Sequence, residues 1–511
     1  GSLALSEIWG NGDITGTLSL DYNNDFRVTA ISVNSNPVNY QYDNDGLLTN
    51  AGDLSLTHHG QNGLLEATQL GNIATQRAHN TFGEMASETA TYNSNPLYHT
   101  FYQRDQLGRI TQKAETVGGI TTTYDYRYDV VGRLVEVKQD KQVVETYTYD
   151  DNGNRLSADT ANGLVFGSYD DQDRLSQYGN ATYTYTDNGE LRHKNDNGQL
   201  TEYHYDVLGN LRSVQLPDGK QIEYVIDARN RRIGKKVNGV LTQAFLYQGS
   251  LNPVAEKDGD GNVVSRFVYG SKVNVPDYLI KGGKTYRILS NHLGSPRLVV
   301  NISDGTVVQR MDYDAFGNVI EDSNPGFQPF GFAGGIYDLD TQLTRFGARD
   351  YDSETGRWTA KDPILFAGGD TNLYGYVLDN PINWIDENGL EAALPVPATG
   401  GGIGEIVAGM GRSIVAGGAI GIGIVMALYP TPVGEGSDIV PTPEPVNMAK
   451  GGKQHIDNEY TREVQQMGLK SPKDICEYLR NQYQKACDKQ ERLKIRKAQK
   501  YYNCDGKNRY Q

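Results

Sequence analysis

The residues best suited to chemistry are acidic side chains between positions 349 and 391. Asp350, Asp362 and Asp386 are candidate acids or bases, and Arg349 directly precedes the first of them. Two carboxyl groups that lie close together cannot both ionise, so one keeps a proton while the other can accept one from water. Hydrolysis of a peptide bond needs such a base, an acid for the carbonyl oxygen or the leaving amine, and a donor for the developing oxyanion. The residue types therefore predict an aspartyl-type hydrolase.

Two alternatives stay open for these residues. Asp386 with Gly389, like Asp352 with Gly356, is also typical of a turn. Arg349 has two candidate roles, because its guanidinium can polarise a carbonyl group or lower the pKa of a neighbouring Asp.

A second group of candidate residues lies in the basic C-terminal tail. Residues 451–511 contain 14 Lys and Arg against 8 Asp and Glu, whereas the whole chain has 48 against 63 and a net charge of -15. The candidates for catalysis or phosphate contact are His455, Asp457, Glu459, Lys497 and Lys500. Metal-dependent nucleases use carboxylates and His, so a divalent metal is a candidate cofactor for the tail. The alternatives are a solvated His before a helix cap and a solvated basic helix face.

The elements that carry the tail candidates are predicted to be helices. Residues 471–474, Ser-Pro-Lys-Asp, place an N-cap, an N1 proline and an N3 acid where helices favour them. Ile475, Leu479 and Leu493 then recur at helical spacing, and the other face is rich in Lys and Arg. Such a face suits the phosphates of a nucleic acid, so we expect a small all-α domain that binds one. The three cysteines form no Cys-x-x-Cys pair, which favours buried thiols over a zinc site.

A glycine-rich hydrophobic segment, residues 400–429, precedes this tail. Its uncharged run from Ser413 to Tyr429 is about 17 residues long, which is the lower limit for crossing a bilayer. Its Gly spacing also suits close helix packing. Three interpretations stay open: a linker helix inside a shell, a segment that aids translocation through a target membrane, and a pore-forming toxin. The Pro residues between 430 and 445 predict a stiff linker.

Most of the chain before position 330 carries a repeat, Tyr-x-Tyr-Asp-x-x-Gly-x-x-Leu. Clear copies begin at Tyr126, Tyr147, Tyr183 and Tyr203, roughly 20 residues apart. Alternate side chains of a strand share a face, so the two Tyr rings of one copy can stack on neighbouring strands. Asp and Gly are preferred at the first and fourth positions of a type I turn. Each copy therefore predicts one β-hairpin.

Hairpins of this kind are not stable alone and must pair edge to edge into one long sheet. Because strands twist, a sheet of that length coils. The 59 Gly and 34 Tyr, without a three-residue period, exclude collagen and favour a turn-rich β protein. The predicted fold class is therefore mainly β, with a hairpin sheet that spirals into a hollow shell, followed by the small all-α domain. An ordinary β-sandwich is the disfavoured alternative.

The repeats and the segment after them resemble the Rhs/YD-repeat family, which includes bacterial Rhs polymorphic toxins, the C component of insecticidal toxin complexes and the teneurins. The matching segments after the repeats are Arg345–Pro363, Asn372–Val377, Asn380-Pro381 and Asp386–Leu390. The resemblance spans residues 3–390 and implies a β cocoon that encloses a toxic C-terminal segment. It also implies that this chain is the C-terminal part of a longer protein.

For the site, the resemblance implies self-cleavage of the bond between Leu390 and Glu391. Arg349, Asp350 and Asp362 match the family's catalytic arginine and aspartate positions. No cofactor is expected for this cleavage.

The resemblance assigns Asp386 to positioning the strand that carries the scissile bond. The next residue, Glu387, stands where the family usually has proline. Because proline restricts φ and has no N–H, its replacement predicts slower cleavage.

These observations predict four regions: a YD-repeat β shell at 1–329, an autoproteolytic closing domain at 330–390, a hydrophobic segment and linker at 391–450, and a basic α-helical toxin domain at 451–511. The predicted function is that of an Rhs-type polymorphic toxin in interbacterial competition. Its shell would enclose a nuclease for DNA or RNA until autoproteolysis releases it. The alternatives are a membrane-inserting, pore-forming toxin and an adhesive YD-repeat protein resembling the teneurins.

The expected partners are a cognate immunity protein, nucleic acid, and a secretion-system spike or delivery protein bound through an upstream region. A transient contact with a target membrane is also expected. The first residues lack a basic region before an apolar core, so no signal peptide is expected. We expect synthesis in the bacterial cytoplasm, export by a specialised system such as type VI secretion, and toxin action in the cytoplasm of the target cell.

Overall fold

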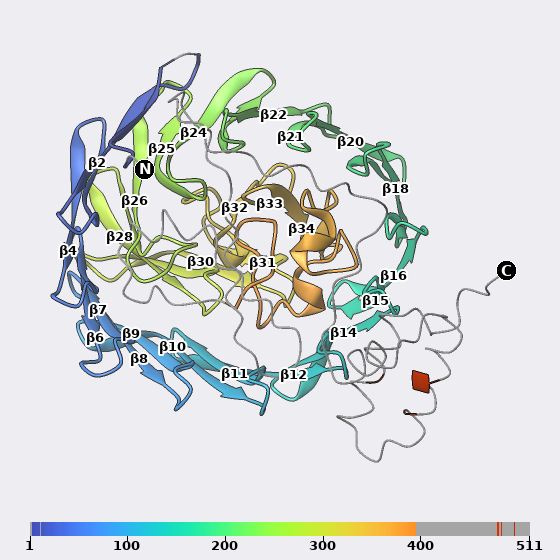
Figure 1. Ribbon diagram of the computed structural model, residues 1–511, viewed down its shortest axis with the longest axis horizontal. Coiled ribbons are helices and arrows are strands. Elements are labelled where there is room, and N and C mark those ends of the chain that lie inside the picture. Colours follow the sequence, from blue (N-terminus) through green and yellow to red (C-terminus); the bar gives the residue numbers. More distant parts are fainter. Residues whose placement is uncertain (1–2, 11, 395–477, 480–481, 483–494, 496–511) are drawn as a thin grey trace. The chain divides into compact units, whose positions relative to one another are not determined.

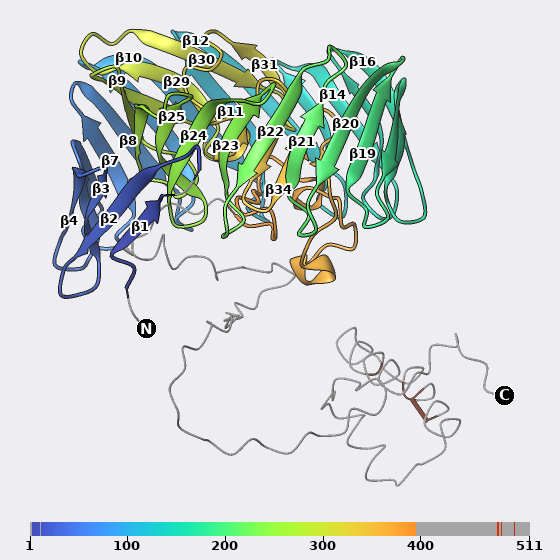
Figure 2. The same cartoon turned by 90° about the horizontal axis from the view of Figure 1, so that it is seen from above.

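The computed structural model describes residues 3–10, 12–394, 478–479, 482 and 495. The chain divides into two compact units, Gly1–Tyr429 and Pro430–Gln511. The described part of the first unit is dominated by β-strands, which form one sheet of 31 strands and a second sheet of four. Figure 2 shows the strands of the large sheet standing side by side around the unit.

The first 23 strands of the large sheet are β1 (Ser6–Trp9), β2 (Gly16–Tyr22), β3 (Val28–Val33), β4 (Asn36–Tyr42), β5 (Leu48–Ala51), β6 (Leu54–His58), β7 (Leu65–Leu70), β8 (Ile73–His79), β9 (Met85–Tyr92), β10 (Asn95–Arg104), β11 (Ile110–Val117), β12 (Ile120–Tyr128), β13 (Leu134–Gln139), β14 (Gln142–Tyr149), β15 (Arg155–Thr160), β16 (Gly163–Tyr169), β17 (Leu175–Tyr178), β18 (Ala181–Tyr185), β19 (Leu191–Asp196), β20 (Gln199–Tyr205), β21 (Leu211–Gln215), β22 (Gln221–Ile226) and β23 (Arg232–Val237). The remaining strands are β24 (Val240–Gln248), β25 (Asn252–Asp258), β26 (Val263–Val268), β27 (Tyr278–Lys281), β28 (Lys284–Ser290), β29 (Pro296–Asn301), β30 (Val307–Tyr313) and β31 (Val319–Asp322). Neighbouring strands pair antiparallel in chain order, as β12 with β13 and β13 with β14. The sheet is therefore one long meander of hairpins.

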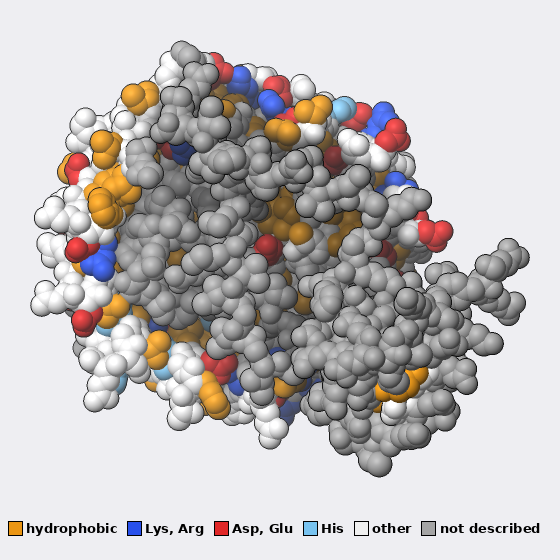
Figure 3. All heavy atoms as spheres, in the orientation of Figure 1, with side chains coloured by type: hydrophobic (Ala, Val, Ile, Leu, Met, Phe, Trp, Pro, Cys, Tyr) orange, Lys and Arg blue, Asp and Glu red, His pale blue; other side chains and the backbone are white. Residues whose placement is uncertain are grey.

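The repeat motif forms the turn of alternate hairpins, as its sequence predicts. In the turn between β12 and β13, the Asp129 carboxylate accepts hydrogen bonds from the N–H groups of Val131 and Arg133, at 3.0 and 2.9 Å. The Gly132 N–H donates to the Asp129 carbonyl at 3.1 Å, and Gly132 has a φ of 101°. Left-handed backbone of this kind favours glycine, which explains the spacing from Asp to Gly. The two residues between this Asp and Gly lie at the hairpin tip and are exposed. Figure 3 shows hydrophobic side chains mixed with charged ones on the described surface.

In the repeat that begins at Tyr147, the second Tyr binds the preceding hairpin. The Tyr149 hydroxyl donates to the Leu134 carbonyl at 2.8 Å, and the Arg133 guanidinium lies 5.0 Å from the centre of the Tyr149 ring. Arg133 is also paired with Asp129 at 2.7 Å. A hydrogen bond and a cation–π contact thus join this repeat to its neighbour.

The sheet coils as a spiral, with its later strands inside its earlier ones (Figure 1). Strands β24–β31 run inside the first turn and pack against it. Leu18 and Leu54 of the first turn share one buried core with Leu246 and Leu279 of the inner strands. Within the described residues, the interior also holds residues 330–390, whose Leu343 packs against the wall. The predicted fold class is confirmed as mainly β, with one long antiparallel sheet that forms a shell.

Residues 330–390, called the closing domain below, belong to the same unit as the wall and contain the small four-stranded sheet. Its elements are β32 (Ile336–Tyr337), β33 (Leu343–Phe346), β34 (Arg349–Asp352), β35 (Arg357–Trp358), and the 3-10 turns η1 (Phe332–Gly334), η2 (Leu365–Gly368) and η3 (Val377–Asp379). Its core is aromatic: Phe346, Tyr351, Trp358 and Tyr376 are buried together, and Tyr351 and Tyr376 have ring centres 4.3 Å apart.

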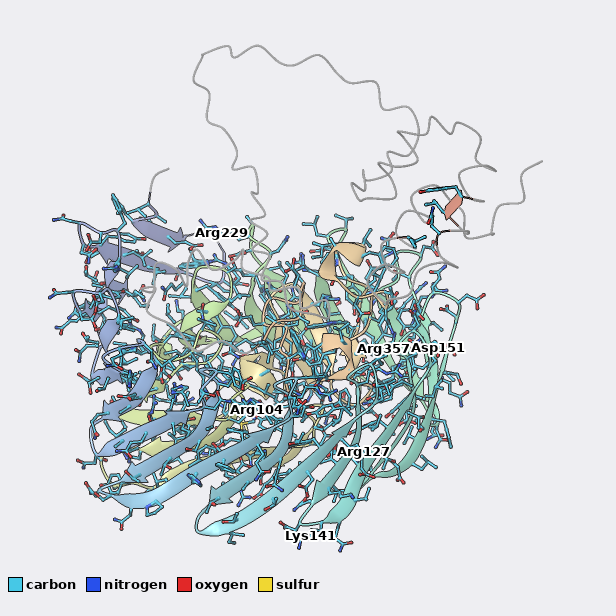
Figure 4. All side chains as sticks on the ribbon, turned by 60° about the horizontal axis from the view of Figure 1, so that its bottom comes forward. Arg104, Arg127, Lys141, Asp151, Arg229 and Arg357 are labelled. Carbon is cyan, nitrogen blue, oxygen red and sulfur yellow. The ribbon has the colours of Figure 1, made fainter. Side chains whose placement is uncertain are left out.

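Hairpin turns of the wall hold the closing domain. Asn383 accepts from the Ile110 N–H at 2.7 Å and donates to the Tyr128 hydroxyl at 2.9 Å. Asn372 donates to Asn154 at 2.9 Å. Figure 4 labels two basic side chains in different environments. Arg357 of β35 is buried over the Tyr374 ring, and Lys141 lies at an exposed hairpin tip. Residues of the repeat turns and of the strand ends beside them therefore hold the closing domain.

In the second unit, the structure describes Tyr478, Leu479, Gln482 and Ile495. All four are helical, and Leu479 and Ile495 are fully buried, which agrees with the predicted helices at these positions. None of the helical segments in the described part of the chain has the length and hydrophobicity of a membrane span. The hydrophobic segment 400–429 and the linker 430–445 lie outside the described residues.

Candidate active site

Strand β34 positions the arginine of the predicted site. Side chains alternate along a strand, so Arg349 and Asp350 point to opposite faces. Arg349 is buried, and its guanidinium stacks on the Trp358 ring with its central carbon 4.2 Å from the ring centre. This stacking holds the fork of Arg349 in one orientation.

The Arg349 guanidinium joins two of the predicted acids. Its Nη2 lies 2.8 Å from Oδ2 of Asp362 and donates to Oδ2 of Asp386 at 3.2 Å. Its Nε donates to the Gly389 carbonyl at 2.6 Å, one residue before Leu390. Arg349 therefore connects both carboxylates to the chain that carries the expected cleavage point.

The expected scissile bond lies in a tight loop closed by a short β-bridge. Ile385 and Ala393 exchange two backbone hydrogen bonds, at 2.8 and 2.6 Å. Inside this loop, Oδ1 of Asp386 accepts from the N–H of Leu390 at 2.9 Å and from the N–H of Glu391 at 3.2 Å. The second of these is the N–H of the Leu390–Glu391 amide itself.

Asn388 is a further residue at the loop that the sequence analysis missed. Its Oδ1 accepts from the same two N–H groups, those of Leu390 and Glu391, at 2.9 and 3.3 Å. Its carbonyl accepts from the Ala348 N–H at 2.9 Å, which joins the loop to the start of β34. An Asn before Gly has the ordinary signature of a turn, so its sequence carried no signal of this contact.

Asp362 lies on the carbonyl side of the same bond. A Cβ atom built on Gly368 would be 2.8 Å from Oδ2 of Asp362 and 2.8 Å from the Leu390 carbonyl oxygen, so these two oxygens flank one point. The other oxygen of Asp362 accepts from the Ile364 N–H at 2.9 Å. One carboxyl group thus lies by the scissile carbonyl and another by the scissile N–H.

Burial dominates the electrostatics of this pair. It raises the pKa of Asp362 to about 6, against the opposing effect of Arg349. Burial also raises the pKa of Asp386, again opposed by Arg349 and by the backbone N–H donors. Carboxyl groups with raised pKa values can exchange protons near neutral pH, as acid–base catalysis requires.

Asp350 is not brought to the scissile bond. It is buried on the other face of β34, where its carboxylate pairs with Arg232 at 2.8 Å and with Arg345 at 2.9 Å. Arg345 also donates to Asn210 of the wall at 3.1 Å. Of the four predicted catalytic residues, the structure therefore groups Arg349, Asp362 and Asp386.

Two glutamates lie within the loop. Burial, with a smaller effect of Asp386, raises the pKa of Glu387 to about 7, and the same causes raise that of Glu391. One carboxylate oxygen of each is buried without a hydrogen-bond partner. Glu387 stands where the family usually has proline. Glutamate at this position adds a buried acid and a backbone N–H that proline lacks. The tail candidates His455, Asp457, Glu459, Lys497 and Lys500 lie outside the described residues.

Comparisons with known proteins agree with the fold. The chain is 28% identical to Teneurin-3 of Danio rerio over 401 residues, which is 74% of this chain and 14% of that protein. It is 29% identical to the tRNA3(Ser)-specific nuclease WapA of Bacillus spizizenii over 275 residues, 51% of this chain and 12% of the nuclease. The chain therefore spans a small fraction of the length of these relatives.

Solved structures share the architecture. A crystal structure of TcdB2-TccC3-Cdc42 superposes with a TM-score of 0.56 at 16% identity, over 74% of this chain and 22% of that chain. This likeness shows the fold alone. The family model described as Teneurin YD-shell matches residues 3–382, so the chain belongs to the YD-shell family, as its Rhs/YD-type repeats predict.

Proposed function

We propose that this chain cleaves its own Leu390–Glu391 bond by aspartyl catalysis. One observation carries the proposal. Two buried carboxyl groups, joined by Arg349, lie on the two sides of a single peptide bond, with Asp362 by its carbonyl and Asp386 on its N–H.

The proposed reaction uses the two acids in opposite protonation states. Asp386, ionised, takes a proton from a water whose oxygen attacks the Leu390 carbonyl carbon, while Asp362, protonated, donates to the carbonyl oxygen. The resulting diol collapses when it returns a proton to Asp362 and Asp386 protonates the Glu391 nitrogen. The C–N bond then breaks, which leaves a carboxyl group on Leu390 and an amine on Glu391.

Arg349 and Asp350 have supporting roles in this proposal. Arg349 contacts Oδ2 of both acids, so it lowers the cost of having one of them ionised in a buried site. Asp350 fixes the opposite face of β34 through Arg232 and Arg345. We therefore assign Asp350 to positioning the strand.

Substitution of either acid tests the reaction. We expect Asp362→Asn and Asp386→Asn to leave the chain uncut, because each removes a proton-transfer group; a loss of 100-fold or more is the usual order for such a group. Denaturing gels and N-terminal sequencing of the fragment that begins at Glu391 measure the result. Asp151→Asn is the matched control, since Asp151 lies at an exposed hairpin tip (Figure 4) and should be cut like wild type. Cleavage of both site variants at the wild-type rate would overturn the proposal.

We propose further that residues 391–511 are the cargo of the shell and that their basic part is a toxic nuclease. The basic charge of the tail supports this, as does the match to a relative named as a tRNA nuclease. The full chain, incubated with DNA and RNA with and without a chelator, should degrade one of them, and loss of activity with chelator would identify a divalent metal as the cofactor. The uncharged run 413–429 favours the rival function, a pore-forming toxin. Dye release from liposomes without nucleic-acid degradation would support that rival.

A further inference from the structure

The 3-10 turn η2 covers the scissile carbonyl with backbone alone. Two hydrogen bonds tie the start of the turn to Asp362. Its side-chain Oδ1 accepts from the Ile364 N–H at 2.9 Å, and its backbone carbonyl accepts from the Leu365 N–H at 3.0 Å. Leu365 and Phe366 point outwards and are 48% and 68% exposed. At the other end of the turn, Gly368 faces the site.

Gly368 lies too close to the reacting atoms to carry a side chain. A Cβ there would come within 2.8 Å of both Oδ2 of Asp362 and the Leu390 carbonyl oxygen, which is closer than real Cβ contacts allow. The backbone of Gly368 does not need glycine for its conformation, since its φ lies outside the left-handed region. Glycine is required at this position only because the neighbouring oxygens leave no room for a Cβ atom.

Moving either oxygen away breaks contacts of the group that carries it. Oδ2 of Asp362 is held by Arg349 at 2.8 Å. The Leu390 carbonyl shares a planar peptide with the Glu391 N–H, which donates to Asp386 and Asn388 at 3.2 and 3.3 Å. A side chain at position 368 must therefore separate the acid from the carbonyl or lift η2 off the site.

On the basis of the proposed self-cleavage, we propose that Gly368 is a positioning residue for that reaction, whose missing side chain lets η2 hold Asp362 against the Leu390 carbonyl. A shift of about 1 Å in a reacting group can cost 100-fold in rate. The neighbouring glycine provides a matched control. Gly369 has a φ of 87° but nothing within 4 Å of a Cβ, so alanine there strains the backbone without touching the site.

The test compares Gly368→Ala and Gly369→Ala in the full chain, with cleavage followed on denaturing gels and folding by thermal unfolding. We expect Gly368→Ala to slow cleavage at least 100-fold and Gly369→Ala to cleave within about threefold of wild type. Any residual cleavage by Gly368→Ala should also decline at lower pH than in wild type, because a carboxyl group displaced towards solvent has a pKa nearer its ordinary value. Cleavage of a folded Gly368→Ala chain at the wild-type rate and pH profile would overturn the inference. An uncut wild-type chain would instead refute the proposed function itself.

If Gly368→Ala prevents folding, the comparison moves to the Asp362→Ala background, which lacks the carboxyl group that a new Cβ meets. There, Gly368→Ala should lower the melting temperature less than it does in the wild-type chain, or restore a folded chain. An equal loss in both backgrounds would contradict the contact between Gly368 and Asp362.

Discussion

At the scale of single residues, the central feature is an acid whose protonation changes near neutral pH. Burial raises the pKa of Asp362 to about 6, so this group is largely protonated below pH 6 and ionised above it. The proposed reaction needs Asp362 protonated and Asp386 ionised. Arg349 pairs with both carboxyl groups, so it stabilises the negative charge on whichever of them is ionised.

The pH dependence of cleavage follows from this shift. We expect the rate to be highest at or below about pH 6 and to fall as the pH rises from 6 to 8, because Asp362 loses the proton that it donates. Refolding the chain from denaturant at a series of pH values, with the fragment quantified on gels, measures the profile. A rate that increases steadily from pH 6 to 8 would show that Asp362 acts in its ionised form.

At the scale of elements, the repeat turn does two tasks at once. In the turn between β14 and β15, the Asp150 carboxylate accepts from the N–H groups of Asn152 and Asn154, at 2.9 and 2.8 Å. Asn154 then contacts Asn372 of the closing domain. The same acid that reverses the chain therefore helps to seat the region that carries the proposed site.

Adjacent aspartates in this turn allow a controlled test. We expect Asp150→Ala to cost about 1 kcal/mol of local stability, because the part-buried Asn154 N–H and the exposed Asn152 N–H lose their acceptor. Hydrogen exchange of the β14–β15 hairpin should then become roughly fivefold faster. Asp151→Ala should leave exchange unchanged, since Asp151 is exposed at the tip. Equal effects of the two substitutions would contradict the role assigned to the first Asp of the repeat.

The hairpins could be predicted from the sequence because each repeat encodes its own turn and its own aromatic face. The packing of one turn of the spiral on another could not, since it depends on contacts such as Gly16 against Leu246, far apart in the chain. At the site, the motif after the repeats pointed to Arg349, Asp362 and Asp386, which the structure brings together. The alternation of β34 already implied that Asp350 and Arg349 face opposite ways. The role inferred for Gly368 depends on how closely its backbone approaches the reacting atoms, and no pattern of residues in the sequence signals such a distance.

At the scale of the whole molecule, the first unit joins a wall to a closing domain, which contains a loop with several hydrogen bonds around one peptide bond. The wall contributes Asn154, Ile110 and Tyr128 to hold that domain. The aromatic core of the domain holds Trp358, on which Arg349 stacks. In the proposed function, the shell thus also serves as a rigid frame for the cleavage site.

The mass of the purified wild-type chain after incubation near pH 6 tests the central claim most directly. The full chain has a mass of 56.4 kDa. We predict that intact-mass spectrometry under denaturing conditions will find two fragments, one ending at Leu390 and one beginning at Glu391, and that Asp362→Asn will show the full-length mass alone. A wild-type chain that keeps its full mass, or that breaks at another bond, would contradict the account.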